Sequence, residues 1–326
     1  MKVLKTFWPR WAVLGVTVVA ALVTVPIVFA GSGVSPKKIT IGVANYTLSA
    51  PYFVGMSKAV QSEASPYKNV SVLVTDANGD AAKFTSNIQD LLTKHPTGLV
   101  LSGGPLEAAP AALAAIEKAG VPVVMVDRKL KGGNYTSWIG PDNFTIGAQD
   151  GAYIAKRLKG HGTLLIIRGG PADNSIGLAR TNGVLSVVSK YPGIKVIKAP
   201  AFGNWSTDGG LAVMEDMLAK HKKIDAVFAE NDSMALGAQR AIANAHRSGE
   251  MFLAGVDGQK EALKAILDGT NYAVTGLNNS DQIGRAGFNR LMAILAGAVA
   301  PKDTVMPSPE ITRANVAKYY NPKALF

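Results

Sequence analysis

The stretch Val227-Phe228-Ala229-Glu230-Asn231-Asp232-Ser233-Met234-Ala235-Leu236-Gly237-Ala238 contains the pattern that decides the fold. It opens in an apolar run at residues 224–229, which is typical of a buried strand, and continues in Ala, Leu and Met residues that favour a helix. The three residues between them, Asn231-Asp232-Ser233, are suited to capping a helix N-terminus. Open α/β sheets bind ligands at the carboxyl ends of their strands. The stretch therefore fits either a helix cap alone or part of a binding site.

The same alternation of strand and helix runs along the chain from Lys38. One series of alternating strands and helices precedes Trp138, and a second series follows it. The expected strands are residues 39–43, 70–75, 98–102 and 121–126 in the first series, and 162–168, 195–199, 224–229, 251–256 and 272–277 in the second. Alternation of this kind predicts βαβ units, and hence two α/β lobes that each contain a parallel sheet and a core of their own. The tail from Met306 is expected to be irregular.

The first 30 residues have the features of a secretory signal peptide. Lys2, Lys5 and Arg10 precede an uncharged apolar run at residues 12–29, and Val28-Phe29-Ala30 offers a small-residue cleavage site. A retained membrane anchor is the alternative, because the apolar run is nearly long enough to span a bilayer. Pro26 and the cleavage site favour removal after Ala30. We therefore expect an exported protein of the periplasm.

Composition excludes several classes of function. The chain has 326 residues, no cysteine and a formal charge of +11. Without the first 30 residues, 31 Lys and Arg remain against 23 Asp and Glu, which leaves +8. The basic residues are scattered and no helix-turn-helix segment precedes the first strand, so we expect no nucleic-acid partner. The absence of cysteine excludes disulfides, thiol catalysis and cysteine metal sites.

Enzyme signatures are also missing from the sequence. The four histidines have no metal-ligand spacing, and no Gly-x-Ser-x-Gly motif accompanies them: His95, His161, His221 and His246. Asp127 and Asp257 could be imagined as glycosidase carboxylates, but nothing else in the chain suggests sugar cleavage. The sequence therefore predicts a protein that is not an enzyme and needs neither cofactor nor metal.

Residues that follow the expected strands combine aromatic rings with planar polar groups. Sugars and polyols present apolar C–H faces, which stack on rings, and hydroxyls, which suit carboxylates, guanidinium groups and amides. Each residue has an ordinary explanation by itself: a surface ion pair for Asp127 and Arg128, a core position for Trp205, a turn for Asp257. Their recurrence at strand ends favours a binding site formed by Tyr52, Phe53, Asp127, Arg128, Arg180, Trp205, Asn231, Asp257 and Asn278.

Seven motifs occur in an order and spacing similar to those of a known family. They are Leu48-Ser49-Ala50-Pro51-Tyr52-Phe53, Val126-Asp127-Arg128, Ile139-Gly140-Pro141-Asp142-Asn143, Ala179-Arg180-Thr181-Asn182-Gly183, the stretch from Ala226 to Ala238, Gly255-Val256-Asp257-Gly258 and Asp281-Gln282-Ile283-Gly284. From Lys38 to about Tyr320, the chain resembles the periplasmic sugar-binding proteins of ABC transporters, of the ribose-binding type.

The resemblance implies two Rossmann-like three-layer α/β/α lobes joined by three crossing segments, near Asp142, near Asn279 and near residues 306–308. The N-terminal lobe would then be residues 31–142 plus 279–306, and the C-terminal lobe residues 143–278 plus 307–326. It also implies sugar contacts: Tyr52 and Phe53 as a stacking wall with Asp127 and Arg128 in the first lobe, Arg180, Trp205, Asn231 and Asp257 in the second, and Asn278 at a crossing.

Three departures from the family pattern leave the identity of the sugar open. Ala50 occupies the place of an amide side chain, Tyr52 replaces a phenylalanine, and Asn278 is shorter than the family's glutamine. These changes alter which hydroxyl groups of a sugar would find a hydrogen-bond partner, and a buried polar group left unpaired costs roughly 1–3 kcal/mol. Another pentose, a hexose or a polyol therefore fits as well as ribose.

The expected function follows from this resemblance. The lobes would close on the solute by a hinge motion, and the closed form would dock on an ABC permease in the inner membrane. The alternative is a sugar-sensing receptor that presents its ligand to a chemoreceptor or sensor kinase. We expect a monomer, because the predicted helices leave no long apolar stripe uncovered.

Overall fold

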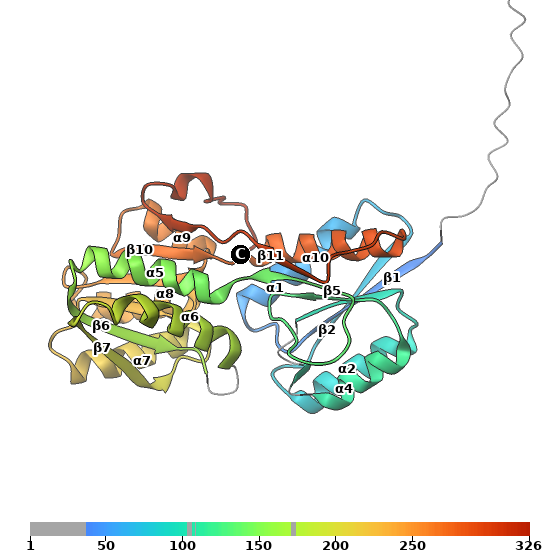
Figure 1. The fold of residues 1–326 in the computed structure, drawn as a ribbon, viewed down its shortest axis with the longest axis horizontal. Helices are drawn as coiled ribbons and strands as arrows, with labels where there is room; N and C mark the ends of the chain where they lie inside the picture. Colours follow the sequence, from blue (N-terminus) through green and yellow to red (C-terminus); the bar gives the residue numbers. More distant parts are fainter. Residues whose placement is uncertain (1–36, 103–105, 108, 171–173) are drawn as a thin grey trace, which may run out of the picture. The chain divides into compact units, whose positions relative to one another are not determined.

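The computed structural model describes residues 37–102, 106–107, 109–170 and 174–326, and the predicted signal peptide at residues 1–30 lies outside this range. Within this part of the chain, the structure forms two α/β lobes, each built on one six-stranded sheet (Figure 1). No helix in the described ranges has both the length and the hydropathy needed to cross a bilayer.

The first sheet has the strand order β11-β5-β4-β3-β1-β2, and all of its strands are parallel. Helices α1 and α10 pack on one face of this sheet, and α2 and α4 on the other (Figure 1). The elements are β1 (Ile39–Asn45), α1 (Pro51–Ala64), β2 (Val70–Asp76), α2 (Ala81–Thr93), β3 (Gly98–Ser102), α4 (Pro110–Ala119), β4 (Val123–Val126), β5 (Ser137–Pro141), α10 (Ser280–Leu295) and β11 (Asp303–Met306).

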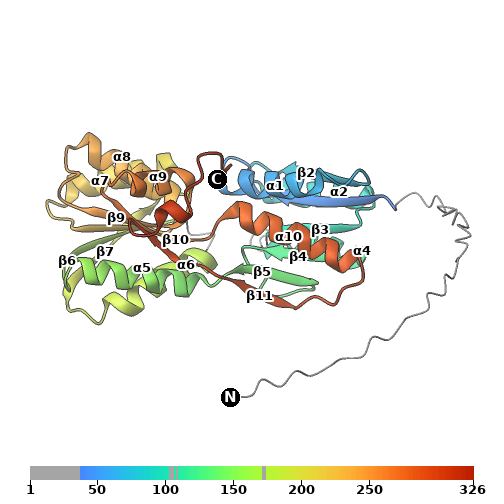
Figure 2. The same cartoon turned by 90° about the horizontal axis from the view of Figure 1, so that it is seen from above.

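The second sheet has the order β12-β10-β9-β8-β6-β7, with β12 antiparallel to β10 and the other pairs parallel. Helices α7, α8 and α9 cover one face, and α5 and α6 the other (Figure 2). The elements are α5 (Asn143–Arg157), β6 (His161–Arg168), α6 (Asn174–Val188), β7 (Gly193–Phe202), α7 (Thr207–Lys220), β8 (Ala226–Ala229), α8 (Asp232–Asn244), β9 (Phe252–Asp257), α9 (Lys260–Leu267), β10 (Tyr272–Leu277), β12 (Glu310–Thr312) and the 3-10 helix η1 (Val316–Lys318).

Strand β8 shows why the central strands are continuous apolar runs. Ala226 and Phe228 belong to the core beneath α5 and α6, whereas Val227 and Ala229 belong to the core beneath α7 and α8. Successive side chains of a strand point to opposite faces, and helices bury both faces of this sheet. Every residue of β8 is therefore apolar, and the polar residues begin only where the strand ends.

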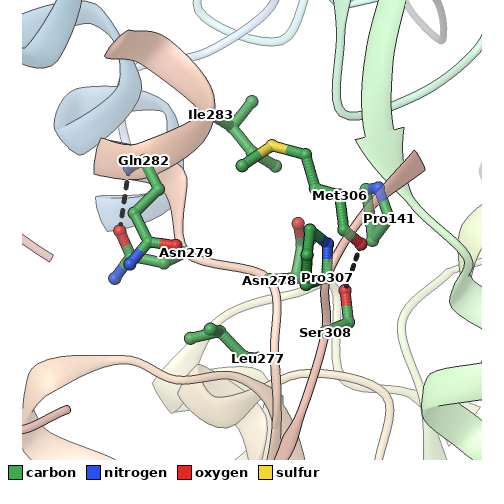
Figure 3. A pocket seen from close by; sticks show the side chains of 9 residues that line it. All are labelled: Pro141, Leu277, Asn278, Asn279, Gln282, Ile283, Met306, Pro307 and Ser308. Atoms are coloured by element: carbon green, nitrogen blue, oxygen red, sulfur yellow. Dashed lines mark hydrogen bonds between the residues drawn. The ribbon is translucent and has the colours of Figure 1, made fainter. Parts of the chain in front are cut away.

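The chain passes between the two sheets three times: after β5, after β10 and after β11. Residues of all three crossing segments line one small cavity of about 10 Å³, which is about the space of one water molecule (Figure 3). Pro141 contributes to it from the first crossing, Asn278 and Asn279 from the second, and Pro307 and Ser308 from the third. The three crossings therefore lie side by side.

Three strands were not anticipated from the sequence. The expectation of an irregular tail from Met306 was wrong, because β12 pairs with β10 there. Strand β11 alternates between exposed and half-buried residues, and β12 buries only Ile311, so neither contains the apolar run that marks a central strand. In β5, Gly140 and Pro141 interrupt the apolar pattern after Ile139. By contrast, β3 and β10 have the expected bounds.

Candidate functional site

A cavity of about 610 Å³ is lined by residues of both lobes. Its volume lies within the range of roughly 300–1,000 Å³ that is usual for small-molecule sites. All nine residues singled out in the sequence line it: Tyr52, Phe53, Asp127, Arg128, Arg180, Trp205, Asn231, Asp257 and Asn278. Side chains not singled out also contribute, among them Tyr46, Ser102, Ile176, Asn204 and Asp208.

The ends of secondary-structure elements position these side chains. Tyr52 and Phe53 lie in the first turn of α1, which begins at Pro51, a residue whose fixed φ suits the first helical position. Asp127 directly follows β4, Asp257 is the last residue of β9, and Asn278 directly follows β10. The polar groups of the site are thus gathered where parallel strands end, as expected for open α/β sheets.

Four cavity residues have a left-handed backbone. The φ angles are 61° at Asp127, 49° at Asn204, 59° at Trp205 and 121° at Asp257. Such conformations are unfavourable for residues with a Cβ, cost roughly 1–3 kcal/mol each, and concentrate at functional sites. At Asp127, the surrounding structure holds the conformation: the indole Nε1 of Trp138 donates to the Asp127 carbonyl oxygen at 3.2 Å.

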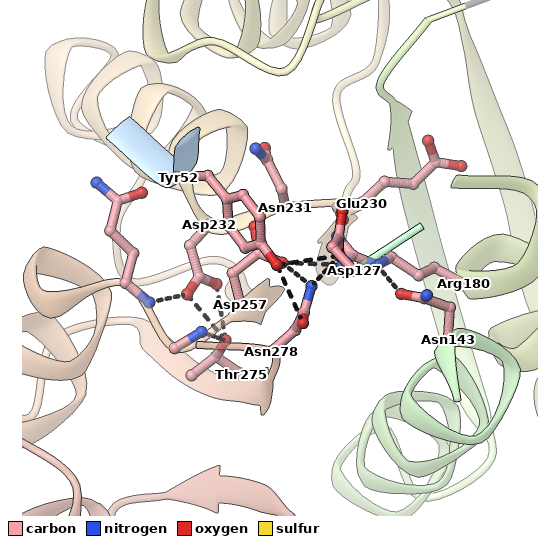
Figure 4. A network of polar contacts seen from close by, with 12 residues as sticks. Tyr52, Asp127, Asn143, Arg180, Glu230, Asn231, Asp232, Asp257, Thr275 and Asn278 are labelled. Atoms are coloured by element: carbon pink, nitrogen blue, oxygen red, sulfur yellow. Dashed lines mark hydrogen bonds and ion pairs between the residues drawn. The ribbon is translucent and has the colours of Figure 1, made fainter. Parts of the chain in front are cut away.

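A hydrogen-bond network crosses the cavity floor from one lobe to the other (Figure 4). The Tyr52 hydroxyl donates to Asp127 Oδ1 at 3.0 Å and lies 3.3 Å from Asn278 Oδ1. The Asn278 side-chain Nδ2 donates to Asp127 Oδ1 at 3.2 Å and to Asp257 Oδ1 at 3.4 Å. Since Asp127 follows a strand of the first lobe and Asp257 ends a strand of the second, Asn278 connects the two lobes at this floor.

Arg180 is held by the protein through three of its nitrogens. Its Nη2 donates to Asp257 Oδ1 at 2.9 Å, its Nη1 to the Glu230 carbonyl oxygen at 2.6 Å, and its Nε to Asn143 Oδ1 at 2.8 Å. The Arg180 and Asp257 side chains are only 3% and 6% exposed. A guanidinium group has five N–H donors, and these contacts use three of them to fix Arg180 and Asp257.

Burial governs protonation in the site. Burial raises the pKa of Asp257 to about 8, against the opposing effect of the Arg180 charge. It also raises the pKa of Tyr52 well above its usual value, with the Asp127 and Asp257 charges adding to the shift. Burial lowers the pKa of Arg128, although the nearby Asp127 and Glu107 charges oppose this. Tyr52 therefore keeps its proton and acts as a hydrogen-bond donor at neutral pH.

Asn231 serves as a helix cap and also lines the cavity. Its Oδ1 accepts from the backbone N–H of Met234 at 3.0 Å, which is the N-cap interaction of α8. Its Nδ2 donates to the Trp205 carbonyl oxygen at 3.2 Å. One amide therefore caps the helix and also holds the Trp205 backbone at the cavity.

Some residues that support the site were not anticipated. Glu230 is buried; its Oε2 accepts from the Gly169 N–H at 2.6 Å, and its Oε1 accepts from Thr181 Oγ1 at 2.5 Å. Asp232 is fully buried and accepts from the Tyr272 hydroxyl at 2.7 Å and the Gln259 N–H at 2.7 Å. In the sequence, Glu230 and Asp232 are marked only as part of a run of three acidic or amide residues that follows an apolar strand. That pattern does not tell whether such a residue contacts the ligand or holds other residues of the site in place.

Comparison with known proteins places the chain in a family. The model of the periplasmic binding protein domain matches residues 41–298. The ribose import binding protein of Bacillus subtilis is 31% identical over 271 residues, which cover 83% of this chain and 86% of that protein.

Two solved structures are similar to the whole described fold. One is an ABC transporter solute-binding protein from Mycobacterium smegmatis with bound glycerol (TM-score 0.81, 29% identity, covering 88% of this chain and 98% of that one). The other is the fructose-binding periplasmic domain of a hybrid two-component system (TM-score 0.77, 32% identity, covering 86% and 92%). The chain belongs to the periplasmic binding protein family, and its two α/β lobes have that family's fold.

Proposed function

We propose that this protein captures a monosaccharide or small polyol in the cavity between its lobes and delivers it to an ABC permease in the inner membrane. The observation that carries the proposal is the composition of the cavity. Aromatic rings (Tyr52, Phe53 and Trp205) and buried hydrogen-bonding groups from both lobes line one space of about 610 Å³. Rings stack on the C–H faces of a sugar, and fixed polar groups bind its hydroxyls.

The polar groups in the cavity suit a neutral solute that carries hydroxyl groups. Two acids, Asp127 and Asp257, lie with two bases, Arg128 and Arg180, among the lining residues, and Arg180 Nη2 donates to Asp257 Oδ1 within the protein. A hydroxyl group, which both donates and accepts, can bind to either kind of side chain without adding charge to the site.

Ligand capture would be coupled to closure of the lobes. Asp127 and Tyr52 belong to the first lobe, and Asp257 and Trp205 to the second. A solute that touches both sets only when the lobes are shut favours the closed form by its differential affinity. We assign residues 31–142 plus 279–306 to one lobe and 143–278 plus 307–326 to the other, with the crossings acting as the hinge.

Export and a monomeric state belong to the same proposal. The basic start, the apolar run and the site after Ala30 support cleavage of a signal peptide, and the family is one of periplasmic proteins. The mature protein would then act in the periplasm as a monomer. N-terminal sequencing of the exported protein and its mass in solution test these two points.

A sugar-sensing receptor is the second candidate. The similarity to the fructose-binding domain of a two-component system favours it. Transport of labelled sugar by cells that lack this chain distinguishes the two: loss of uptake supports the transport function, whereas normal uptake with a lost transcriptional or motile response supports the sensor.

The experiment that tests capture is thermal unfolding of residues 31–326 with D-ribose, other pentoses, hexoses, polyols and nucleosides. A solute at a hundred times its Kd adds roughly 2.7 kcal/mol to the stability. For a chain of this size, the midpoint rises by several degrees. A shift with one sugar or polyol supports the proposal, and no shift with any of them contradicts it.

A further inference from the structure

The segment after η1 is anchored to the second lobe. Tyr319 and Tyr320 pack against the core beneath α7, α8 and α9. Further along, the Lys260 ammonium group at the start of α9 donates to the Ala324 carbonyl oxygen at 2.8 Å. The path of the chain up to Ala324 is therefore determined by contacts with the second lobe.

Phe326, two residues later, packs against the first lobe. The residue is only 3% exposed. A Cβ placed on Gly55 in α1 would lie 2.8 Å from the Phe326 Cβ, which is closer than real Cβ atoms approach. The lack of a side chain at Gly55 thus makes room for Phe326 on the surface of α1.

The Phe326 ring contacts Tyr52, which lines the cavity. The two ring centroids are 5.4 Å apart, with an angle of 84° between the ring planes. Phe53 makes a similar edge-to-face contact with Tyr52, at 5.5 Å and 84°. Both distances lie within the favourable range for such pairs. The Tyr52 ring is therefore held by two other rings, while its hydroxyl donates to Asp127 at the cavity floor.

We propose that Phe326 is a positioning residue of the sugar site, which holds the Tyr52 ring so that its hydroxyl is directed at Asp127 and Asn278. The inference rests on the proposed sugar-binding function. Phe326 is not among the residues that line the cavity, whereas Tyr52 is, so Phe326 acts through Tyr52. Because its segment is anchored to the second lobe, Phe326 also links that lobe to α1 of the first.

Two substitutions at adjacent positions test the role of the ring. Phe326→Leu removes the aromatic edge but keeps a large apolar side chain, and Leu325→Ala changes a neighbour that is 49% exposed. The probes are D-ribose, D-fructose and xylitol, titrated by calorimetry. Given the usual strength of an edge-to-face pair, we expect Phe326→Leu to weaken binding by about twofold to tenfold, and Leu325→Ala to leave it unchanged.

A double-mutant cycle separates positioning from general stability. Tyr52→Phe keeps the ring and removes the hydroxyl. If Phe326 acts by directing that hydroxyl, Phe326→Leu loses most of its effect on affinity in the Tyr52→Phe background. An equal loss in both backgrounds would mean that Phe326 affects binding only through the fold, and this would overturn the inference.

The environment and the motion of the Tyr52 ring can also be measured by NMR in the protein without sugar. In spectra of protein labelled with ¹³C-tyrosine, the signal lost in Tyr52→Phe is assigned to Tyr52. We expect Phe326→Leu to shift this signal and to speed the flipping of the Tyr52 ring, and Leu325→Ala to do neither. An unchanged Tyr52 signal in Phe326→Leu overturns the inference. Failure of the unmodified protein to bind any member of the panel of pentoses, hexoses and polyols instead contradicts the proposed function.

Discussion

The indole ring of Trp205 lies directly against the backbone of Gly169. A Cβ added to Gly169 would be 2.1 Å from Trp205 Cε2, whereas a Cβ added to the neighbouring Gly170 would be 3.7 Å from Trp205 Nε1. The first distance is a severe overlap with a rigid ring, and the second is an ordinary contact. One aromatic wall of the cavity therefore depends on a glycine in the loop that follows β6.

Gly169→Ala is expected to displace Trp205 from the cavity wall. The methyl group and the ring cannot occupy the same space, and inserting extra volume into packed structure typically costs 1–3 kcal/mol. We predict weaker sugar binding and a change in tryptophan fluorescence.

Gly170→Ala is the matched control: Gly170 also lines the cavity, but its added methyl group clears the Trp205 ring, so this variant should lose much less affinity than Gly169→Ala. Equal binding by Gly169→Ala and Gly170→Ala would show that Trp205 is not held against this loop in the binding-competent protein.

Stability should fall as the pH rises, because of Asp257. Burial raises the pKa of Asp257 to about 8, whereas an unfolded Asp has a pKa of about 3.9. An acid that binds its proton more tightly when folded contributes stability that is fully present below about pH 4 and is lost as the pH rises through about 8. Burial also raises the pKa of Asp150, which adds to the same trend.

Asp257→Asn should therefore flatten the dependence of the unfolding free energy on pH between about pH 4 and 8. Urea unfolding of the protein without sugar measures this dependence at each pH. Asp216→Asn, on the exposed surface of α7 beside Lys220, serves as the control and should retain the slope of the unmodified protein. A slope that is the same in all three proteins would contradict the assignment to Asp257.

Glu230→Ala should destabilise the protein beside the cavity. The two carboxylate oxygens of Glu230 accept hydrogen bonds from the Gly169 N–H and the Thr181 hydroxyl. An alanine offers neither group an acceptor oxygen, and the Gly169 N–H can only donate. An unsatisfied buried group costs about 1–3 kcal/mol, so we expect a loss of at least this size in urea unfolding. Glu215→Ala, at an exposed position of α7, should cost almost nothing; comparable losses would refute this role for Glu230.

The sequence predicts the central strands well because helices bury both of their faces. Strands β3 and β10 consist of buried residues throughout, and apolar runs of that kind are visible without knowledge of the fold. The strands β11 and β12 escape prediction, because each lies at the edge of its sheet and has few buried residues. Their pairing depends on contacts between distant parts of the chain.

In the site, too, the sequence predicts the residues that a local pattern marks, but not the contacts between distant parts of the chain. Polar residues at strand ends, such as Asp127 and Asp257, can be identified locally, and they line one cavity. The contacts that orient them cannot: Trp138 donates to the carbonyl of Asp127, and Phe326 reaches Tyr52 from the far end of the chain. Nor does the sequence indicate that three nitrogens of Arg180 are used within the protein.

The central claim is that the cavity binds a sugar or polyol through Asp127. Calorimetric titration of residues 31–326 with the panel of pentoses, hexoses and polyols tests it most directly, in the unmodified protein, in Asp127→Ala and in Lys129→Ala. Lys129 is a neighbour that forms an exposed ion pair with Asp303.

We predict saturable binding of one solute per chain. Because a hydrogen bond to a charged group contributes about 1.5–3 kcal/mol, Asp127→Ala should weaken this binding by about 10- to 150-fold, and Lys129→Ala should leave it unchanged. Binding of no member of the panel, or equal binding by Asp127→Ala, would contradict the claim.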